Sequence, residues 1–143
     1  TRVDWCAGAS ILVRRRMIEA VGSFDETFFL YFEETDLCLR AARAGWSVIY
    51  APQSRVVHVG SVSTGMKTWR RTPGYWFDSR RHYFVKNHGR AYWAAATLAQ
   101  LAGGLIWRLR CALSNRPHGM SDSFLHDLTR HSLRALLGRA AQS

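Results

Sequence analysis

Acidic residues are concentrated in the N-terminal part of this 143-residue chain, so its N-terminal and C-terminal parts differ in charge. Seven of the ten Asp and Glu residues lie within the first 36 positions, whereas the stretch from Lys67 to Arg116 holds ten Lys or Arg and one acid, Asp78. The front part therefore has the mixed charge of an ordinary folded domain. The back part is a basic arm, which implies an anionic partner: a lipid surface, a nucleic acid or a phosphorylated substrate.

The composition excludes a disordered chain and is compatible with one ordinary domain, because 48% of the residues are hydrophobic. The three cysteines, Cys6, Cys38 and Cys111, are odd in number and far apart in the sequence, which argues against a disulfide framework and a zinc site. Such usage fits a reducing compartment. No signal peptide is visible, and residues 3–5 already have the pattern of a strand, so we expect this chain to be the C-terminal piece of a longer protein.

The front part predicts short alternating elements. The apolar run 9–13 suits a buried strand, and residues 14–21 suit a helix that ends at Gly22. An aromatic loop follows, and a second helix is expected from 33 to 44, where Leu37, Ala41 and Ala44 are spaced i, i+4, i+7 before Gly45. Two short strands are expected at 46–50 and 55–59, with a turn at 51–53 between them and a small-residue loop at 60–65.

The back part predicts mainly helix. Residues 68–87 are basic and aromatic, and residues 91–107 carry no charge, although 17 residues are at the short limit for a membrane span. Basic residues flank the uncharged run on both sides. A last amphipathic helix is expected at 121–140, with Ser121 or Asp122 as its cap. The uncharged run fits either an interfacial helix on a lipid surface or a helix packed against the protein.

An acidic cluster, Glu33, Glu34 and Asp36, opens the second predicted helix directly after the aromatic loop. Helix capping alone explains acids in a first turn. Three acids exceed that need, and an aromatic wall would raise a carboxylate pKa towards the range of a working base. His58 has two explanations as well: a histidine packed within a Val-rich strand, or a metal ligand at the end of that strand.

Six ordered motifs together resemble family-2 glycosyltransferases of the GT-A fold, and among these the bacterial rhamnosyltransferase-like branch that builds cell-wall and surface polysaccharides. The motifs are the segments 8–15, 21–26, 28–40, 45–46, 50–52 and 57–58. The resemblance implies an α/β fold class. Residues 1–66 would be the acceptor-side portion of a GT-A catalytic domain. The composition of residues 67–143 predicts a basic, mainly helical extension, which either associates with a membrane or packs on the protein.

The resemblance also implies a function and a set of site residues. The enzyme would be an inverting glycosyltransferase that moves a sugar, with rhamnose as the family-level expectation, from a nucleotide-diphosphate donor to a cell-wall or surface-polysaccharide acceptor. Glu34 matches the catalytic base, where the usual residue is Asp, and Glu33 and Asp36 accompany it. His58 matches a metal-binding histidine. The substrate-binding positions would be Trp5, Gly8, Ala9, Tyr31 and Arg40.

The cofactor implied is Mg²⁺ or Mn²⁺, held mainly by a DxD motif. This sequence contains neither a DxD motif nor a nucleotide-binding βαβ half, so we expect both upstream and expect the chain to be inactive alone. The expected partners are a nucleotide-diphospho-sugar donor, a polyprenyl-linked or glycan acceptor and an anionic membrane surface. The expected location is cytoplasmic, peripheral to the inner face of the plasma membrane.

Two other classes of function stay open. A nucleic-acid-binding module would use the interleaved basic and aromatic residues of the arm, although no RRM, KH or helix-turn-helix pattern accompanies them. A non-catalytic interaction domain descended from a transferase would explain the missing donor half.

Overall fold

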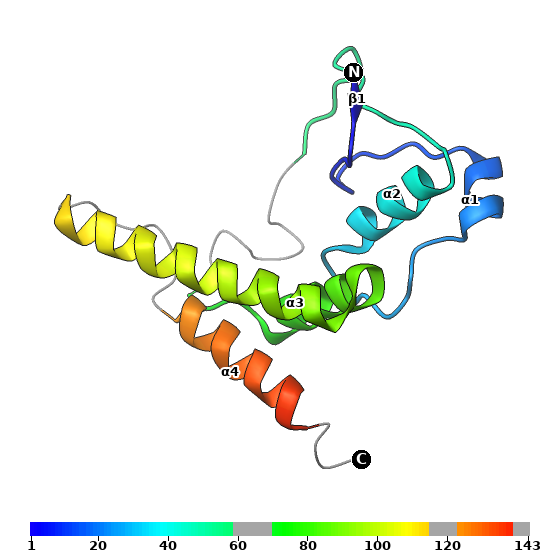
Figure 1. The fold of residues 1–143 in the computed structure, drawn as a ribbon. Helices are drawn as coiled ribbons and strands as arrows, with labels where there is room; N and C mark the ends of the chain where they lie inside the picture. Colours follow the sequence, from blue (N-terminus) through cyan, green and yellow to red (C-terminus); the bar gives the residue numbers. More distant parts are fainter. Residues whose placement is uncertain (59–69, 115–122, 139–143) are drawn as a thin grey trace. The chain divides into compact units, whose positions relative to one another are not determined.

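The computed structural model describes residues 1–58, 70–114 and 123–138. The chain divides into two compact units, Thr1–Lys67 and Thr68–Ser143 (Figure 1). The first unit contains β1, α1, α2 and β2, and the second contains α3 and α4.

The two helices predicted for the first unit are confirmed. Helix α1 spans Arg15–Val21 and ends at Gly22, whose positive φ of 82° suits a glycine and whose N–H donates to the Ile18 carbonyl at 2.8 Å. Helix α2 spans Glu33–Arg43, with acids in its first turn and basic residues in its last, the arrangement that the helix dipole favours. The aromatic segment before α2 is a loop, as predicted.

The small core of the first unit lies where α1 and α2 meet. Met17, Leu37 and Ala41 are buried, and Trp46 packs against them together with two residues of α1. The Trp46 N–H also donates to the Ala41 carbonyl at 2.9 Å, which fixes the chain as it leaves the helix. Ala44, predicted to continue the apolar face, is instead exposed, because α2 ends at the residue before it.

The sheet of the first unit is minimal. Strand β1, Arg2–Val3, pairs antiparallel with β2, Val48–Ile49. The strand predicted at 46–50 is therefore present in its central part, and the turn at 51–53 is closed by the Ser54 N–H donating to the Ala51 carbonyl at 3.0 Å.

Two predicted strands are wrong in this structure. Residues 9–13 and 55–58 have no strand pairing among the described residues. Leu12 is fully exposed and Val57 is 95% exposed, so neither segment is buried. An apolar run becomes a strand only when a neighbouring strand pairs with its N–H and C=O groups, and neither segment has one here. Residue 59 and the predicted loop 60–65 lie outside the described residues.

Helix α3, Gly74–Leu113, folds back on itself at Gly89, which has φ 86° and ψ 169°. The guanidinium of buried Arg80 donates to the Thr97 hydroxyl at 3.0 Å, although 17 residues separate the two. In a straight helix that separation would span about 25 Å, from a rise of about 1.5 Å per residue. The predicted helical back part is therefore a helical hairpin, with glycine at its bend.

Helix α4, Phe124–Leu137, packs against this hairpin. The Phe77 ring lies 5.7 Å from the Phe124 ring and 5.6 Å from the His131 ring. Gly104 lies directly under Leu125, close enough that a Cβ on the glycine would be 2.5 Å from a Leu125 methyl carbon. The helix begins after Ser123, and the predicted caps, Ser121 and Asp122, lie outside the described residues.

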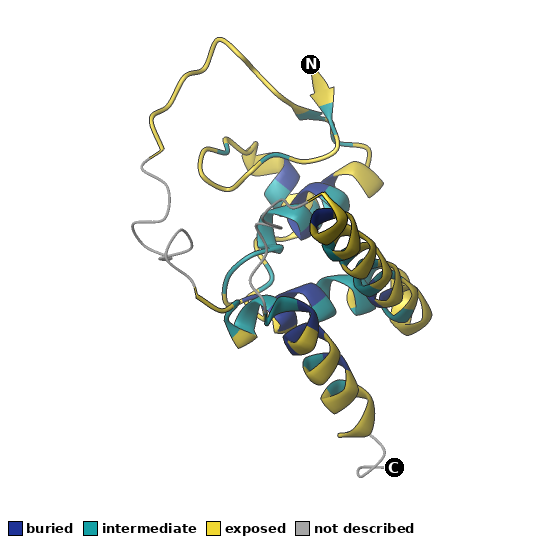
Figure 2. Ribbon diagram, turned by 90° about the vertical axis from the view of Figure 1, so that its left-hand side faces the viewer, coloured by how far each residue is buried: buried dark blue, intermediate teal, exposed yellow. Residues whose placement is uncertain are grey.

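The second half of α3 is mostly exposed, as Figure 2 shows. The apolar side chains exposed there include Leu98, Leu105, Ile106, Trp107 and Leu109. Within the described parts of the chain, no helix is long and apolar enough to cross a membrane.

Candidate functional site

The aromatic loop reaches α2 through two residues with an unusual backbone. Tyr31 and Phe32 both have φ of 69°, a left-handed conformation that non-glycine residues rarely adopt. Phe32 is the last residue before the helix, and its carbonyl accepts the Asp36 N–H at 2.9 Å. Each such residue costs about 1–3 kcal/mol and persists only where the surroundings enforce it. The segment that presents Glu33 and Glu34 is therefore held in a specific, strained geometry.

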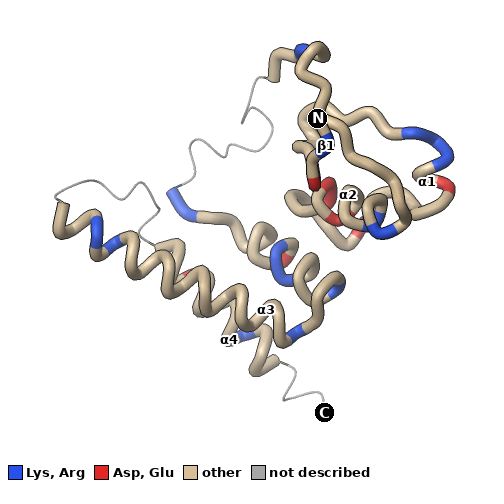
Figure 3. Tube along the Cα trace, turned by 45° about the horizontal axis from the view of Figure 1, so that its top comes forward, with Lys and Arg blue, Asp and Glu red and all other residues tan. Residues whose placement is uncertain are grey.

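Both glutamates carry a buried oxygen that lacks a hydrogen bond. The Oε2 atoms of Glu33 and Glu34 are shielded from solvent and have no hydrogen-bond partner within the described residues. Burial raises the pKa of the Glu33 carboxyl and the charge of Glu34 adds to the rise, while a backbone hydrogen bond opposes them. A buried acceptor without a donor is costly, so the described residues leave one oxygen of each carboxylate unsatisfied. Figure 3 shows the acidic start of α2.

Gly8, one of the predicted substrate-binding positions, lies near Glu34. A Cβ placed on Gly8 would be 3.7 Å from Glu34 Cβ and 4.0 Å from its Cδ, so Gly8 lies one methyl group away from contact with this side chain. Ala9 is exposed beside it, and Trp5 is 51% exposed. The structure thus brings together Gly8 and Glu34, which are 26 positions apart in the sequence.

Cys6 is a member of this cluster that the sequence did not predict. Burial raises the pKa of its thiol, and Cys38, which shares a hydrogen bond with it, and the charge of Glu34 raise it further. Cys6 and Cys38 are thus neighbours in space although they are far apart in the sequence, and both are free thiols. No sequence signal marks this pairing, because it depends on how the 4–10 segment folds over α2.

Asp36 and Arg40 form an ion pair that is buried at Asp36 and partly exposed at Arg40. Asp36 is fully buried, and the Arg40 Nε–H donates to its Oδ2 at 2.8 Å. The same guanidinium donates to the carbonyls of Val21, Gly22 and Ser23, at 2.5, 3.2 and 2.7 Å. Arg40 therefore ties the end of α1 to α2. The i, i+4 spacing of the two residues was a sequence signal for this pair. Substrate binding by Arg40 and catalysis by Asp36 stay predictions.

The remaining predicted site residues, Tyr31 and His58, are not fully buried. Tyr31 is half-buried in the strained loop, and His58 is exposed in a segment without strand structure. The described portion of the chain contains no group of three or more His, Cys, Asp or Glu residues that could hold a metal ion. The residues described here thus do not form a metal site by themselves.

Comparison with known proteins gives a consistent set of matches. The model of the family described as "Glycosyl transferase family group 2" matches residues 2–131. The N-acetylglucosaminyl-diphospho-decaprenol L-rhamnosyltransferase of Mycobacterium tuberculosis (strain ATCC 25618 / H37Rv) is 33% identical over 137 residues, which are 96% of this chain and 41% of that protein. The rhamnosyltransferase WbbL of Escherichia coli (strain K12) is 45% identical over 58 residues, which are 41% of this chain and 22% of that protein.

This chain thus spans about two fifths of the length of the mycobacterial relative. No solved structure matches it significantly.

Proposed function

This chain belongs to glycosyl transferase family group 2, and from that premise we propose that it supplies the acceptor side of an inverting sugar transfer, with Glu34 as the general base. The observation that carries the proposal is the buried Glu34 Oε2, which has no hydrogen-bond partner in the described part of the chain. Gly8 lies next to this side chain and adds no side chain of its own, so it leaves room for a substrate hydroxyl. Glu33 and the strained Tyr31–Phe32 segment would keep the base in position.

The reaction proposed is a single in-line displacement. Glu34 accepts the proton of an acceptor hydroxyl as that oxygen forms a bond to the anomeric carbon of the donor sugar. The bond from the anomeric carbon to the diphosphate breaks, and the nucleoside diphosphate leaves with the electron pair. Inversion follows because the attacking oxygen approaches from the face opposite the leaving group.

Rhamnose is the sugar that we propose for the donor, as a nucleotide-diphosphate derivative. Both relatives are named as rhamnosyltransferases, which supports this choice. The name of the mycobacterial relative specifies an N-acetylglucosaminyl-diphospho-decaprenol substrate. We therefore propose an acceptor of the same kind, a sugar linked through diphosphate to a polyprenol. Glycosyl transfer is proposed for the whole protein, of which this chain is a part.

A divalent cation, Mg²⁺ or Mn²⁺, is proposed with His58 as one ligand, and it would neutralise charge on the departing diphosphate. The described residues alone do not assemble a metal site, so its other ligands would come from the rest of the protein. The test is a metal titration of the complete enzyme: His58→Ala is expected to raise the metal concentration needed for half-maximal activity. An unchanged titration would remove His58 from the site.

An anionic membrane surface is the proposed location of the second unit, on the cytoplasmic side of the plasma membrane. The exposed apolar residues of α3, such as Leu105 and Leu109, are interleaved with Arg108 and Arg110, a pattern that suits a lipid headgroup region. Salt-sensitive sedimentation with anionic vesicles is expected. Salt-sensitive binding to oligonucleotides without vesicle binding would instead support a nucleic-acid-binding module.

Glu34→Gln in the complete enzyme tests the base directly. The amide keeps the shape of the side chain but cannot accept the proton, so turnover is expected to fall by about 10²–10⁴-fold while donor binding stays within about twofold. Glu19→Gln is a matched control, because Glu19 is exposed on α1. A Glu34→Gln enzyme that kept a large share of wild-type kcat would rule out Glu34 as the base and favour a non-catalytic role for this unit.

A further inference from the structure

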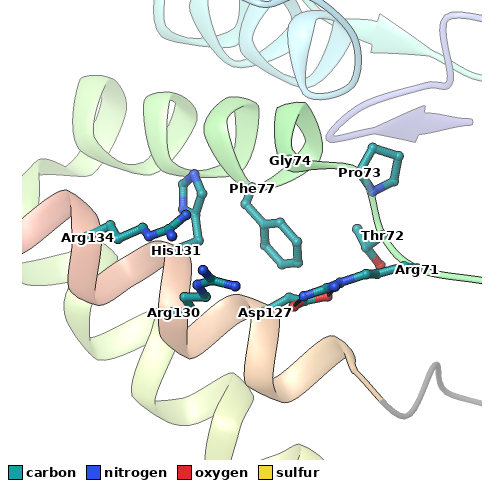
Figure 4. A pocket seen from close by; sticks show the side chains of 9 residues that line it. All are labelled: Arg71, Thr72, Pro73, Gly74, Phe77, Asp127, Arg130, His131 and Arg134. Atoms are coloured by element: carbon teal, nitrogen blue, oxygen red, sulfur yellow. Dashed lines mark hydrogen bonds and ion pairs between the residues drawn. The ribbon is translucent and has the colours of Figure 1, made fainter.

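An open, basic pocket lies in the second unit, between the start of α3 and one face of α4 (Figure 4). Its volume is about 390 Å³, within the range of about 300–1,000 Å³ that is usual for small-ligand pockets. Arg130, His131 and Arg134 line it from α4, and Phe77 lines it from α3. The positions 130 and 134 are one helical turn apart, so both guanidinium groups are carried on the same side of α4.

The charges of this pocket are unbalanced in favour of cations. Among the described residues that line the pocket, Asp127 is the one acid, and it accepts two hydrogen bonds from the guanidinium of Arg71, so the two charges cancel locally. Arg130 and Arg134 are exposed, and the guanidinium of neither residue has a hydrogen bond or ion pair with any part of the chain that the structure describes. Two guanidinium groups therefore face the pocket with their donors available to a ligand.

The first turn of α3 adds to the positive electrostatic potential of this pocket. The helix begins at Gly74, which lines the same pocket, and its first turn contains no acid that would neutralise the positive end of the helix dipole. His131 is oriented by a 2.7 Å contact between its Nε2 and Asp78 Oδ1. The Phe77 ring provides an apolar wall beside these polar groups.

We propose that this pocket binds a diphosphate group, with Arg130 and Arg134 as its principal ligands. Guanidinium groups bind phosphate oxygens through paired, charge-assisted hydrogen bonds, and two of them one turn apart suit two linked phosphates better than a single carboxylate. The apolar wall would accept the first carbons of an isoprenyl chain. The arrangement of the pocket residues alone supports binding of a diphosphate group. Only the assignment of that group to a polyprenyl-diphosphate acceptor rests on the proposed function.

The experiment measures binding of inorganic diphosphate and of geranyl diphosphate to the full 143-residue chain by isothermal titration calorimetry at low ionic strength. Arg130→Gln/Arg134→Gln is expected to weaken binding of both probes by about tenfold or more. The matched control, Arg90→Gln/Arg110→Gln, removes the same charge from exposed positions outside the pocket and is expected to change binding by less than about twofold. Circular dichroism confirms that both double variants are folded.

The comparison of variants decides the proposal. Equal weakening in the two double variants would mean that only the net charge of the arm matters, and it would overturn the site. Arg130→Lys/Arg134→Lys, which keeps the charge but loses the paired donors, is expected to bind more weakly than wild type and more tightly than the glutamine variant; wild-type affinity would overturn the paired-donor geometry. Within a confirmed site, geranyl diphosphate binding about tenfold tighter than inorganic diphosphate indicates a lipid-linked ligand, and equal affinity indicates a free one.

These measurements do not depend on turnover. Loss of the anion site would leave the assignment of Glu34 untouched, and a Glu34→Gln enzyme that remained active would leave the anion site untouched.

Discussion

The backbone of Gly8 lies against the side chain of Glu34, at a distance that a methyl group would just fill. A Cβ at residue 8 would make ordinary contacts of 3.7–4.0 Å with Glu34, so Gly8→Ala is expected to fold normally. Gly8→Val would extend over the carboxylate and is expected to lower kcat/KM for the acceptor by about tenfold or more in the complete enzyme, because misplacement of about 1 Å is costly. The kinetics of the Gly, Ala and Val series test this, with thermal unfolding as the control. Equal activity throughout would place the acceptor elsewhere.

Arg40 is expected to be essential for the stability of the first unit. Arg40→Met removes the guanidinium that pairs with a fully buried carboxylate, Asp36, and that donates to three backbone carbonyls, so a loss of about 3 kcal/mol in the free energy of unfolding is expected. Arg40→Lys keeps the positive charge but not the planar set of guanidinium donors, so it should recover only part of the lost free energy of unfolding. Arg16→Met, at an exposed position of α1, is the control and should change stability by less than about 0.5 kcal/mol. Urea unfolding of the full chain measures all three variants.

Cys6 is expected to report on the charge of Glu34. Because burial, Cys38 and Glu34 all raise the pKa of the Cys6 thiol, its alkylation by iodoacetamide should be slow at pH 8. Glu34→Gln removes one of these causes and should lower the pKa, so alkylation at the same pH becomes faster. Glu33→Gln is the matched control, since Glu33 is not among the causes. Peptide mass spectrometry gives the rate at Cys6, and equal rates in the two variants would contradict the placement of Cys6 beside Glu34.

Two neighbouring glycines in α3 are expected to respond in opposite ways to alanine. Gly103 has open space around it, so Gly103→Ala should stabilise the chain by about 0.5–1 kcal/mol through helix propensity. At Gly104 a Cβ would lie 2.5 Å from one Leu125 methyl carbon and 3.3 Å from Cγ. Overpacking of this kind costs about 1–3 kcal/mol and should outweigh the gain in propensity. Thermal melts that shift in the same direction for both variants would be evidence against the packing of α4 on α3.

Stability is expected to fall in acid through Asp127. Hydrogen bonds from Arg71 hold the pKa of this carboxyl at about 2, below its ordinary 3.8, although burial acts in the opposite direction. A carboxylate whose pKa is lowered by folding stabilises the native state above its unfolded pKa, and this contribution is lost as the pH falls from about 4 to about 2. The difference in unfolding free energy between wild type and Asp127→Asn should therefore shrink across that window. Urea unfolding at pH 5, 4, 3 and 2.5 measures it, and a constant difference would contradict the ion pair.

Helical segments were predictable from the sequence because their signals are local. Leu37 and Ala41 repeat at helical spacing, and Gly22 permits the backbone at which α1 ends. The predicted strands at 9–13 and 55–59 depended on partners that local pattern cannot supply, and their described residues are unpaired. The fold-back at Gly89 also escaped prediction, since an isolated glycine within a helical pattern is usually tolerated without a bend.

The candidate site was predictable in one part and not in another. Glu33 and Glu34 follow from their position after the aromatic loop. The proximity of Gly8 and of Cys6 to Glu34 depends on chain segments that meet only after folding. The structural use of Arg40 had a sequence signal in its spacing from Asp36, but its three carbonyl contacts, at residues 21–23, had none.

The left-handed backbone of Tyr31 and Phe32 lowers stability at the start of α2, where the proposed catalytic base lies. Glycine would adopt this backbone with less strain at either position, so the present residues make the first unit less stable than its own architecture allows. The chain thereby keeps two aromatic residues directly before Glu33 and Glu34 in the sequence. A search for more heat-resistant variants would therefore select glycine at these two positions early. Such variants would lose the aromatic residues that precede Glu33 and Glu34.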